Sequence, residues 1–187
     1  MFVHGHRITL LRARTTTTGR FDVVTDSGIV IRDMTIDDLD VVFAINEENV
    51  PAVGRETLDD LCAIFGVCSV HLVAEIDGRV RGFCMVMPPG VDYGSPNYLY
   101  FCERHEDFVY LDRVAITADS QGRGIGPMLY REVERRTTAP WFALEVNVKP
   151  PNEGSMRFHA REGFVEVDQL ETRPGKIVSL MMKPLTE

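Results

Sequence analysis

The chain has 187 residues, of which 44% are hydrophobic, and a formal net charge of −8 at pH 7. This length and composition predict one globular domain with a complete hydrophobic core. The negative charge argues against a nucleic-acid partner, and no apolar run approaches the roughly 20 residues of a membrane span. Four cysteines without C-x-x-C spacing predict core thiols in a reducing compartment, so we expect a cytoplasmic protein.

The first twenty residues differ from the rest because they hold four arginines, a TTTT run and no acidic residue. Such a start is weakly typical of a transit peptide, but a start-site extension, a disordered arm or an edge strand at residues 8–11 fits equally well. We expect residues 1–27 to be a non-catalytic extension outside the core and residues 28–187 to form a single domain.

The first half of that domain predicts a strand, two helices and a hairpin. The helices begin after Thr35 and Thr57, each of which is followed by acidic residues of a first helical turn. Asp77-Gly78 is a strong hairpin signal between two apolar strands. The predicted strands cover residues 29–34, 70–76 and 80–86.

Residues 88–106 predict a long irregular insertion with several prolines, glycines and tyrosines. Loops of this length in compact domains are usually functional or mobile. We expect this insertion to border the substrate-binding end of the domain.

The second half predicts a strand, a glycine loop and a helix to about residue 136, followed by further strands and a helix. Gly163 follows the last helix at a typical C-terminal position. The predicted order gives an α/β (α+β) fold, with a mixed central sheet of about six to seven strands and helices on both faces. The remaining predicted elements are a strand at 142–148, a helix at 152–162 and paired strands at 164–170 and 176–182.

The most specific segment is the strand–loop–helix pattern that starts at residue 109. Its loop, QGRGIG at residues 121–126, opens a helix. Gly122, Gly124 and Gly126 leave backbone N–H groups uncovered at the positive end of the helix dipole, which favours a pyrophosphate. The spacing of a Rossmann fingerprint and the Gly-Lys-Ser/Thr of a P-loop are both absent. Because a purely structural turn would not need three glycines, the loop predicts an anion-binding cradle.

This loop resembles the acetyl-CoA-binding signature of the GNAT acetyltransferase superfamily, Gln/Arg-x-x-Gly-x-Gly/Ala after a strand. Residues 145–167 resemble the second half of that signature, Asn-x-x-small-x-x-apolar-Tyr-x-x-x-Gly-Phe, with His159 in the Tyr position. The DRV sequence of the preceding strand and the NVPAVG loop at residues 49–54 are similar to one bacterial subgroup of predicted acetyltransferases. The matching positions are Asn152, Ser155, Phe158, Gly163 and Phe164.

The resemblance implies acetyl-CoA as cofactor and assigns two sets of backbone contacts to it. Residues 121–126 would hold the pyrophosphate, and the strand at Val114 and Ile116 would pair with the pantetheine arm like an added strand. An N–H near Ile116 could polarise the thioester carbonyl. Asn152 could act as a helix cap, a CoA contact or both. The expected cofactor-binding residues are Val114, Ile116, Gln121, Gly122, Arg123, Gly124, Ile125, Gly126, Asn152 and Ser155.

His159 is the predicted general acid, because the family often places a Tyr hydroxyl near the thiol at this position and an imidazolium also donates a proton. The alternative is a helix-surface histidine that pairs with Glu162 or Asp168. Both roles remain open from the sequence.

Asp112 is the first candidate for the general base, and it shares a strand face with Tyr110, which we place with it in the catalytic set. An ion pair between Asp112 and Arg113, or an Arg of another strand, is the alternative. The other candidate bases are Glu47, Glu103, His105 and Glu106.

These expectations combine into an N-acetyltransferase that moves an acetyl group to a primary amine of a small molecule or a protein N-terminus, by direct transfer in a ternary complex. The rival readings are a CoA-binding sensor without turnover and an acyltransferase that uses a longer acyl-CoA. The resemblance also allows a homodimer, and no metal is expected. The expected substrate-binding residues are Tyr98, Tyr100, Asn46 and Glu47.

Overall fold

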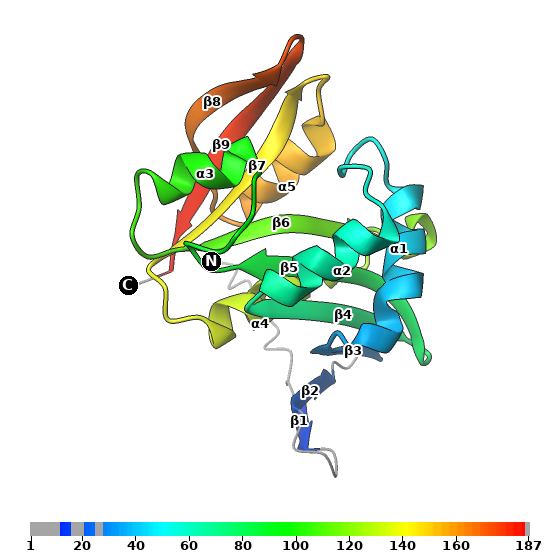
Figure 1. The fold of residues 1–187 in the computed structure, drawn as a ribbon. Coiled ribbons are helices and arrows are strands. Elements are labelled where there is room, and N and C mark those ends of the chain that lie inside the picture. The colour runs from blue at the N-terminus through cyan, green and yellow to red at the C-terminus, as the bar shows by residue number, and fades with distance from the viewer. Residues whose placement is uncertain (1–11, 16–20, 25–27, 186–187) are drawn as a thin grey trace, which may run out of the picture.

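The computed structural model describes residues 12–15, 21–24 and 28–185, and in this part of the chain nine strands form one sheet (Figure 1). Their order is β1-β2-β3-β4-β5-β6-β7-β9-β8. The strands are β1 (Arg12–Thr15), β2 (Phe21–Val24), β3 (Ile29–Asp33), β4 (Val70–Ile76), β5 (Arg79–Met87), β6 (Val109–Ile116), β7 (Trp141–Lys149), β8 (Val165–Arg173) and β9 (Lys176–Pro184). The helices are η1 (Ile36–Asp38), α1 (Leu39–Glu48), α2 (Leu58–Val67), α3 (Pro96–Cys102), η2 (Ala118–Ser120), α4 (Ile125–Arg136) and α5 (Glu153–Arg161).

Strands β3 to β9 confirm the predicted mixed α/β sheet. The two additional strands, β1 and β2, lie within residues 1–27 and pair antiparallel with each other and with the edge strand β3. The part of the extension that they occupy therefore continues the sheet rather than lying apart from it. The edge strand suggested at residues 8–11 lies outside the described residues.

Local sequence signals account for the start of α2 and for the hairpin that joins β4 and β5. The Thr57 hydroxyl accepts a hydrogen bond from the backbone N–H of Asp60 (3.1 Å), which satisfies one free donor of the first turn of α2. Asp77 and Gly78 adopt φ values of 52° and 71°, the left-handed conformation that a two-residue hairpin turn needs. Both predictions are confirmed.

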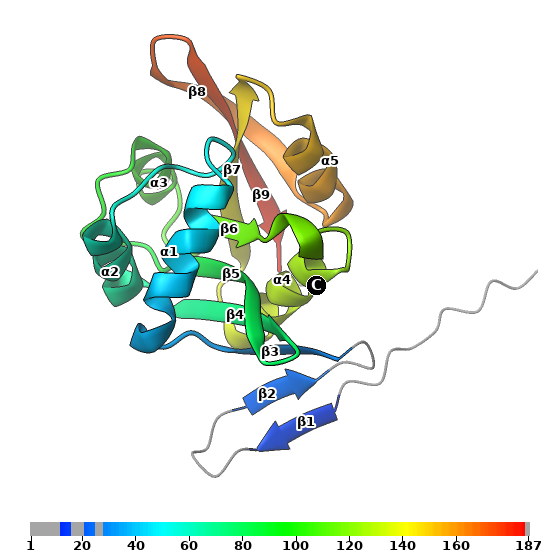
Figure 2. The same cartoon turned by 90° about the vertical axis from the view of Figure 1, so that its right-hand side faces the viewer.

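The sheet has a hydrophobic core on each face. Helices α1, α2 and α3 cover one face and α5 lies on the other, as Figure 2 shows. Leu39, Leu61 and Tyr98 are buried in the first core, whereas Leu129 and Val133 of α4 are buried in the second. The sheet therefore separates α3 from the helix that follows the glycine loop.

The prediction that residues 88–106 are irregular is wrong, because this insertion contains α3. Pro96 occupies the first turn, where its missing N–H costs no hydrogen bond, and Tyr98 and Phe101 are fully buried at helical spacing. The Ser-Pro start and the i, i+3 aromatic pair are the signals that would have identified this helix.

Strands β6 and β7 separate soon after they meet, and this separation creates the space for a site. They pair in parallel only at Val109–Phe142 and Tyr110–Ala143, after which β7 continues alongside β9. Figure 1 shows β7, β8, β9 and α5 forming an arm that diverges from β3–β6. From Leu111 onward, the edge of β6 that faces β7 has no strand partner. No helix among the described residues is long and apolar enough to cross a membrane.

Candidate active site

The glycine loop provides an open N-terminus for α4. Gly122 and Gly124 have φ values of 72° and 83°, which side chains rarely adopt, and Gly124 is the N-cap of the helix. The φ of Gly126 is not positive, but a Cβ at this position would lie 2.9 Å from Cζ of Phe158 on α5. The loop therefore needs glycine at two positions for backbone conformation and at a third for the close approach of α5.

The exposed edge of β6 continues from this loop. The N–H of Thr117 donates to Arg81 O on β5 (2.8 Å), so by strand alternation the backbone groups of Val114 and Ile116 face the space beside β7. The carbonyl oxygen of Ile116 indeed accepts from the side chains of Gln121 (3.2 Å) and Asn49 (3.3 Å) rather than from a strand. An extended ligand could add to this edge as a strand does.

Two adjoining cavities occupy the space between β6, β7 and α5. The larger, of about 580 Å³, lies against the glycine loop and the edge of β6. The smaller, of about 100 Å³, is bordered by charged residues of β6, β7 and β9. Six residues line both cavities, which therefore form one continuous site: Ala52, Val53, Val114, Asn152, Ser155 and His159.

The larger cavity contains nearly all of the predicted cofactor-binding residues. Arg123 is the exception, because its side chain is exposed and lines neither cavity. Asn152 caps α5, since its Oδ1 accepts from the N–H of Ser155 (3.1 Å). The predicted residues that line this cavity are Val114, Ile116, Gln121, Gly122, Gly124, Ile125, Gly126, Asn152 and Ser155.

These features fit the cofactor that the resemblance implies. Acetyl-CoA has a pyrophosphate, which the free N–H groups at the start of α4 suit, and an extended pantetheine arm, which the unpaired edge of β6 suits. A cavity of about 580 Å³ is within the usual range for a cofactor site.

The sequence interpretation missed Glu145 of β7, which lines the smaller cavity. Its Oε2 accepts a hydrogen bond from the Tyr110 hydroxyl (2.6 Å). Burial is the main cause that raises the pKa of Glu145 to about 7, with a further increase from Asp112, while the hydrogen bond from Tyr110 and the charge of Lys176 lower it. A carboxylate in the middle of an apolar strand, FALEVNV, was the available signal.

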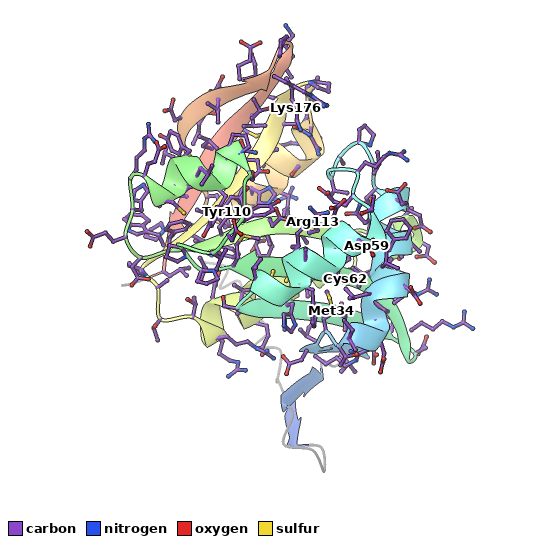
Figure 3. All side chains as sticks on the ribbon, in the orientation of Figure 1. Met34, Asp59, Cys62, Tyr110, Arg113 and Lys176 are labelled. Carbon is purple, nitrogen blue, oxygen red and sulfur yellow. The ribbon has the colours of Figure 1, made fainter. Side chains whose placement is uncertain are left out.

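Tyr110 and Asp112, the predicted catalytic pair, are both held by hydrogen bonds to neighbouring side chains. Tyr110 is fully buried, and burial together with Glu145 raises its pKa well above the usual value. Asp112 lines the smaller cavity, but its oxygens accept hydrogen bonds from the Tyr93 hydroxyl and from Nε of Arg113 (2.6 Å). The ion pair that the sequence left as an alternative for Asp112 is therefore the one observed. In Figure 3, Tyr110 and Arg113 lie along β6, with Lys176 toward the far end of the arm.

Arg113 completes a buried polar network behind the smaller cavity. Its guanidinium donates to Asn46 Oδ1 (3.2 Å) and to Glu56 Oε1 (3.2 Å) as well as to Asp112. Asn46 is fully buried and also donates to Gly54 O (3.0 Å). Both ends of the buried Asn46 amide are therefore occupied within the protein, Nδ2 by the loop between α1 and α2 and Oδ1 by Arg113 of β6, which does not fit the predicted contact with substrate.

His159 is neither an imidazolium nor a surface histidine. It is 4% exposed, and burial lowers its pKa to about 4. Its Nδ1 lies 2.8 Å from the carbonyl oxygen of Ser155, so Nδ1 carries the hydrogen and Nε2 accepts from the Tyr130 hydroxyl (2.7 Å). His159 lies in the wall of both cavities as a neutral ring with both nitrogens hydrogen-bonded.

The other predicted substrate residues lie away from both cavities. The Tyr98 hydroxyl accepts from Val91 N (2.9 Å) and donates to Pro88 O (2.8 Å), which anchors the insertion. Tyr100 donates to Asp168 (2.9 Å) on β8. Glu47 pairs with Arg55 (3.1 Å) in a separate shallow pocket. None of these three residues lines either cavity, and their part in an acceptor pocket stays a prediction. The alternative bases Glu103, His105 and Glu106 also line neither cavity.

Comparisons with known proteins identify the family and the fold of the chain. The sequence model described as "Acetyltransferase (GNAT) family" matches residues 39–164. No curated protein sequence matches the chain. The structure is similar to the ribosomal-protein-S18-alanine N-acetyltransferase of Escherichia coli, with 18% identity over 85% of this chain and 95% of that chain and a TM-score of 0.66.

Two further solved structures share the fold. The Ard1 protein of Thermoplasma volcanium has 17% identity over 86% of this chain and 99% of that chain, with a TM-score of 0.68. The yncA acetyltransferase of Salmonella typhimurium, solved with its cofactor acetyl-CoA, has 20% identity over 86% and 96% and a TM-score of 0.64. The chain therefore belongs to the GNAT acetyltransferase family, whose members use acetyl-CoA.

Proposed function

We propose that this protein transfers the acetyl group of acetyl-CoA directly to a primary amine, with Glu145 as the general base. The observation that carries the proposal is the position of Glu145 in the smaller cavity, which continues into the cavity of the glycine loop. Bound acetyl-CoA supplies the thioester whose acetyl group is transferred. The acceptor is a small-molecule amine or a peptide N-terminus.

Glu145 has the properties that removal of a proton from an ammonium group requires. With a pKa near 7, about half of the carboxyl groups are ionised at neutral pH, and each can hold the proton that the amine loses before it attacks. Tyr110 holds one carboxylate oxygen in place. Asp112 and Arg113 neutralise each other beside it.

The backbone supplies the remaining functions in this proposal. The N–H groups of residues 121–126 bind the pyrophosphate, and Val114 and Ile116 align the pantetheine arm. The Ile116 N–H faces the open edge and is available to polarise a carbonyl. His159, which is neutral, forms part of the wall of both cavities and does not protonate the leaving group as an imidazolium. The C–S bond therefore breaks to give a thiolate, which is protonated by water.

The proposal is tested by CoA release with a panel of amines that includes a peptide with an N-terminal alanine and small primary amines. Glu145→Gln should lower kcat/KM by roughly 10²- to 10⁴-fold without loss of acetyl-CoA binding. Glu171→Gln, on the exposed strand β8, is the matched control and should resemble wild type.

Two outcomes would contradict the proposal in different ways. Wild-type turnover by Glu145→Gln would remove Glu145 from the mechanism. If acetyl-CoA binds but no amine gives CoA release, the protein is the CoA-binding sensor instead. A preference for longer acyl-CoA donors would favour the second enzyme reading.

A further inference from the structure

The residues that line both cavities mark the place where the two cavities meet. The larger cavity contains the glycine loop and the smaller one contains Glu145. In the proposed reaction an acetyl group passes from a cofactor in the first cavity to an amine in the second, so the bond that breaks lies at this junction. The polar side chains at the junction belong to α5 and its N-cap, and they are Asn152, Ser155 and His159.

His159 holds the hydroxyl group of Ser155. Its Nδ1 lies 2.8 Å from the carbonyl oxygen of Ser155, which can only accept, so Nδ1 carries the hydrogen. Nδ1 also lies 3.2 Å from Oγ of Ser155, so the hydroxyl oxygen accepts from the same N–H. The Tyr130 hydroxyl donates to Nε2 (2.7 Å) and keeps the ring in this tautomer. The Ser155 hydroxyl therefore has one lone pair occupied and its own hydrogen available to donate.

The stability of α5 does not account for this hydroxyl. A serine within a helix often returns its hydroxyl hydrogen to a carbonyl of the preceding turn, but within the described part of the chain Ser155 Oγ contacts only His159. The carbonyl oxygen of Ser155 already satisfies Nδ1 of His159, and the bond to the cap residue Asn152 uses the backbone N–H of Ser155 (3.1 Å). Neither the histidine nor the cap needs Oγ, so the half-buried hydroxyl is a donor that remains available to a ligand at the junction.

We propose that Ser155 is a catalytic residue whose hydroxyl donates a hydrogen bond to the leaving sulfur, and that His159 is its positioning residue. This inference rests on the proposed acetyl transfer. The ammonium group first loses one proton to Glu145. The C–N bond then forms as the C–S bond breaks, and the electron pair of the C–S bond goes to sulfur. Ser155 stabilises the negative charge there and keeps its own proton, while sulfur takes a proton from water and the nitrogen releases its second proton to water.

The first test is calorimetric binding of free CoA between about pH 7 and about pH 10, a range that spans the ordinary pKa of a thiol. A hydrogen bond to the ionised form lowers the pKa of a thiol, so CoA should bind the wild type more tightly as the pH rises. In Ser155→Ala this gain should be roughly 10-fold smaller, because the donor to the thiolate is lost.

A CoA analogue that lacks the sulfur, measured at the same pH values, corrects for the titration of protein groups. Its affinity should have the same pH dependence in the wild type and in Ser155→Ala. The charged residues that border the two cavities, and whose titration this control removes, are Asp112, Arg113, Glu145, Arg161, Glu162 and Lys176.

The second test is the rate of CoA release with the best amine of the panel. Ser155→Ala should lower kcat by roughly 10- to 100-fold with little change in the KM of the amine, because the lost hydrogen bond forms only as charge develops on sulfur. Ser155→Thr keeps a hydroxyl group and should recover most of the rate and of the pH-dependent gain in CoA affinity. His159→Gln removes the imidazole N–H that holds Ser155 and should have intermediate losses in both assays.

The matched control is Ala160→Ser, which adds a hydroxyl group at an exposed position of the same helix and should resemble the wild type in both assays. Ser155→Ala keeps the backbone N–H that bonds to Asn152, so its melting temperature should be close to that of the wild type.

The failure of this inference can be distinguished from failure of the proposed function. If the affinity of Ser155→Ala for CoA has the wild-type pH dependence, Ser155 does not contact the sulfur and the inference is wrong, even where turnover falls. Wild-type kcat in Ser155→Ala would also overturn it, with Glu145 still the base if Glu145→Gln is inactive. If the wild type acetylates no amine but loses its pH-dependent gain in Ser155→Ala, the contact with sulfur is supported and the proposed function is refuted.

Discussion

The buried, neutral His159 predicts a specific loss of stability in mild acid. In the unfolded chain a histidine binds its proton with a pKa near 6.5, whereas in the folded protein burial lowers the pKa of His159 to about 4. Between these values the unfolded state binds more protons. The free energy of unfolding therefore falls as the pH drops below 6.5 and levels off below about 4.

The magnitude follows from the two pKa values. At pH 5 the unfolded state is almost fully protonated at this position and the folded state is about one-tenth protonated. The linkage relation then gives a loss of about 2 kcal/mol relative to pH 7.5. Other titrating groups also contribute, so the effect must be isolated by comparison with a variant that cannot titrate.

Urea denaturation at pH 7.5 and pH 5 of the wild type and of His159→Gln measures this difference. Glutamine can accept from Tyr130 but does not titrate, so the variant should lose about 2 kcal/mol less than the wild type between the two pH values. Equal losses would mean that the folded protein protonates His159 as easily as the unfolded chain does. The imidazolium would then be available at neutral pH, and the role of general acid would return.

Three other changes test separate parts of the site. Gly126→Ala places a methyl group against Phe158, so acetyl-CoA should raise the melting temperature of this variant less than that of the wild type. An equal rise would show that the contact between Gly126 and Phe158 does not matter for acetyl-CoA binding. Lys176→Met removes a charge that lowers the pKa of Glu145, so the pH midpoint of kcat/KM should rise; an unchanged midpoint would show that Lys176 does not act on it. Tyr98→Phe removes two buried hydrogen bonds and should lower the free energy of unfolding by about 1–3 kcal/mol in urea denaturation. A raised acceptor KM in that variant would instead support the predicted acceptor-pocket role.

Short-range patterns determined much of this protein from the sequence. Three of the confirmed features depend only on residues within a few positions of one another, so the sequence is enough to predict them. They are the helix cap at Thr57, the hairpin turn at Asp77-Gly78 and the glycine loop. The two signature segments likewise predicted a set of cofactor-binding residues, and nine of these line the cavity between β6 and α5.

Only the tertiary structure decided which charged side chains line the smaller cavity and how burial shifts the pKa of Glu145. Glu145 and Asp112 are 33 positions apart, and their exposure depends on where β6 and β7 diverge. The same divergence leaves Glu145 buried beside Tyr110, and this burial raises the pKa of Glu145 to about 7. Burial and long-range hydrogen bonds are properties of the assembled fold, because they depend on neighbours that the linear sequence does not bring together.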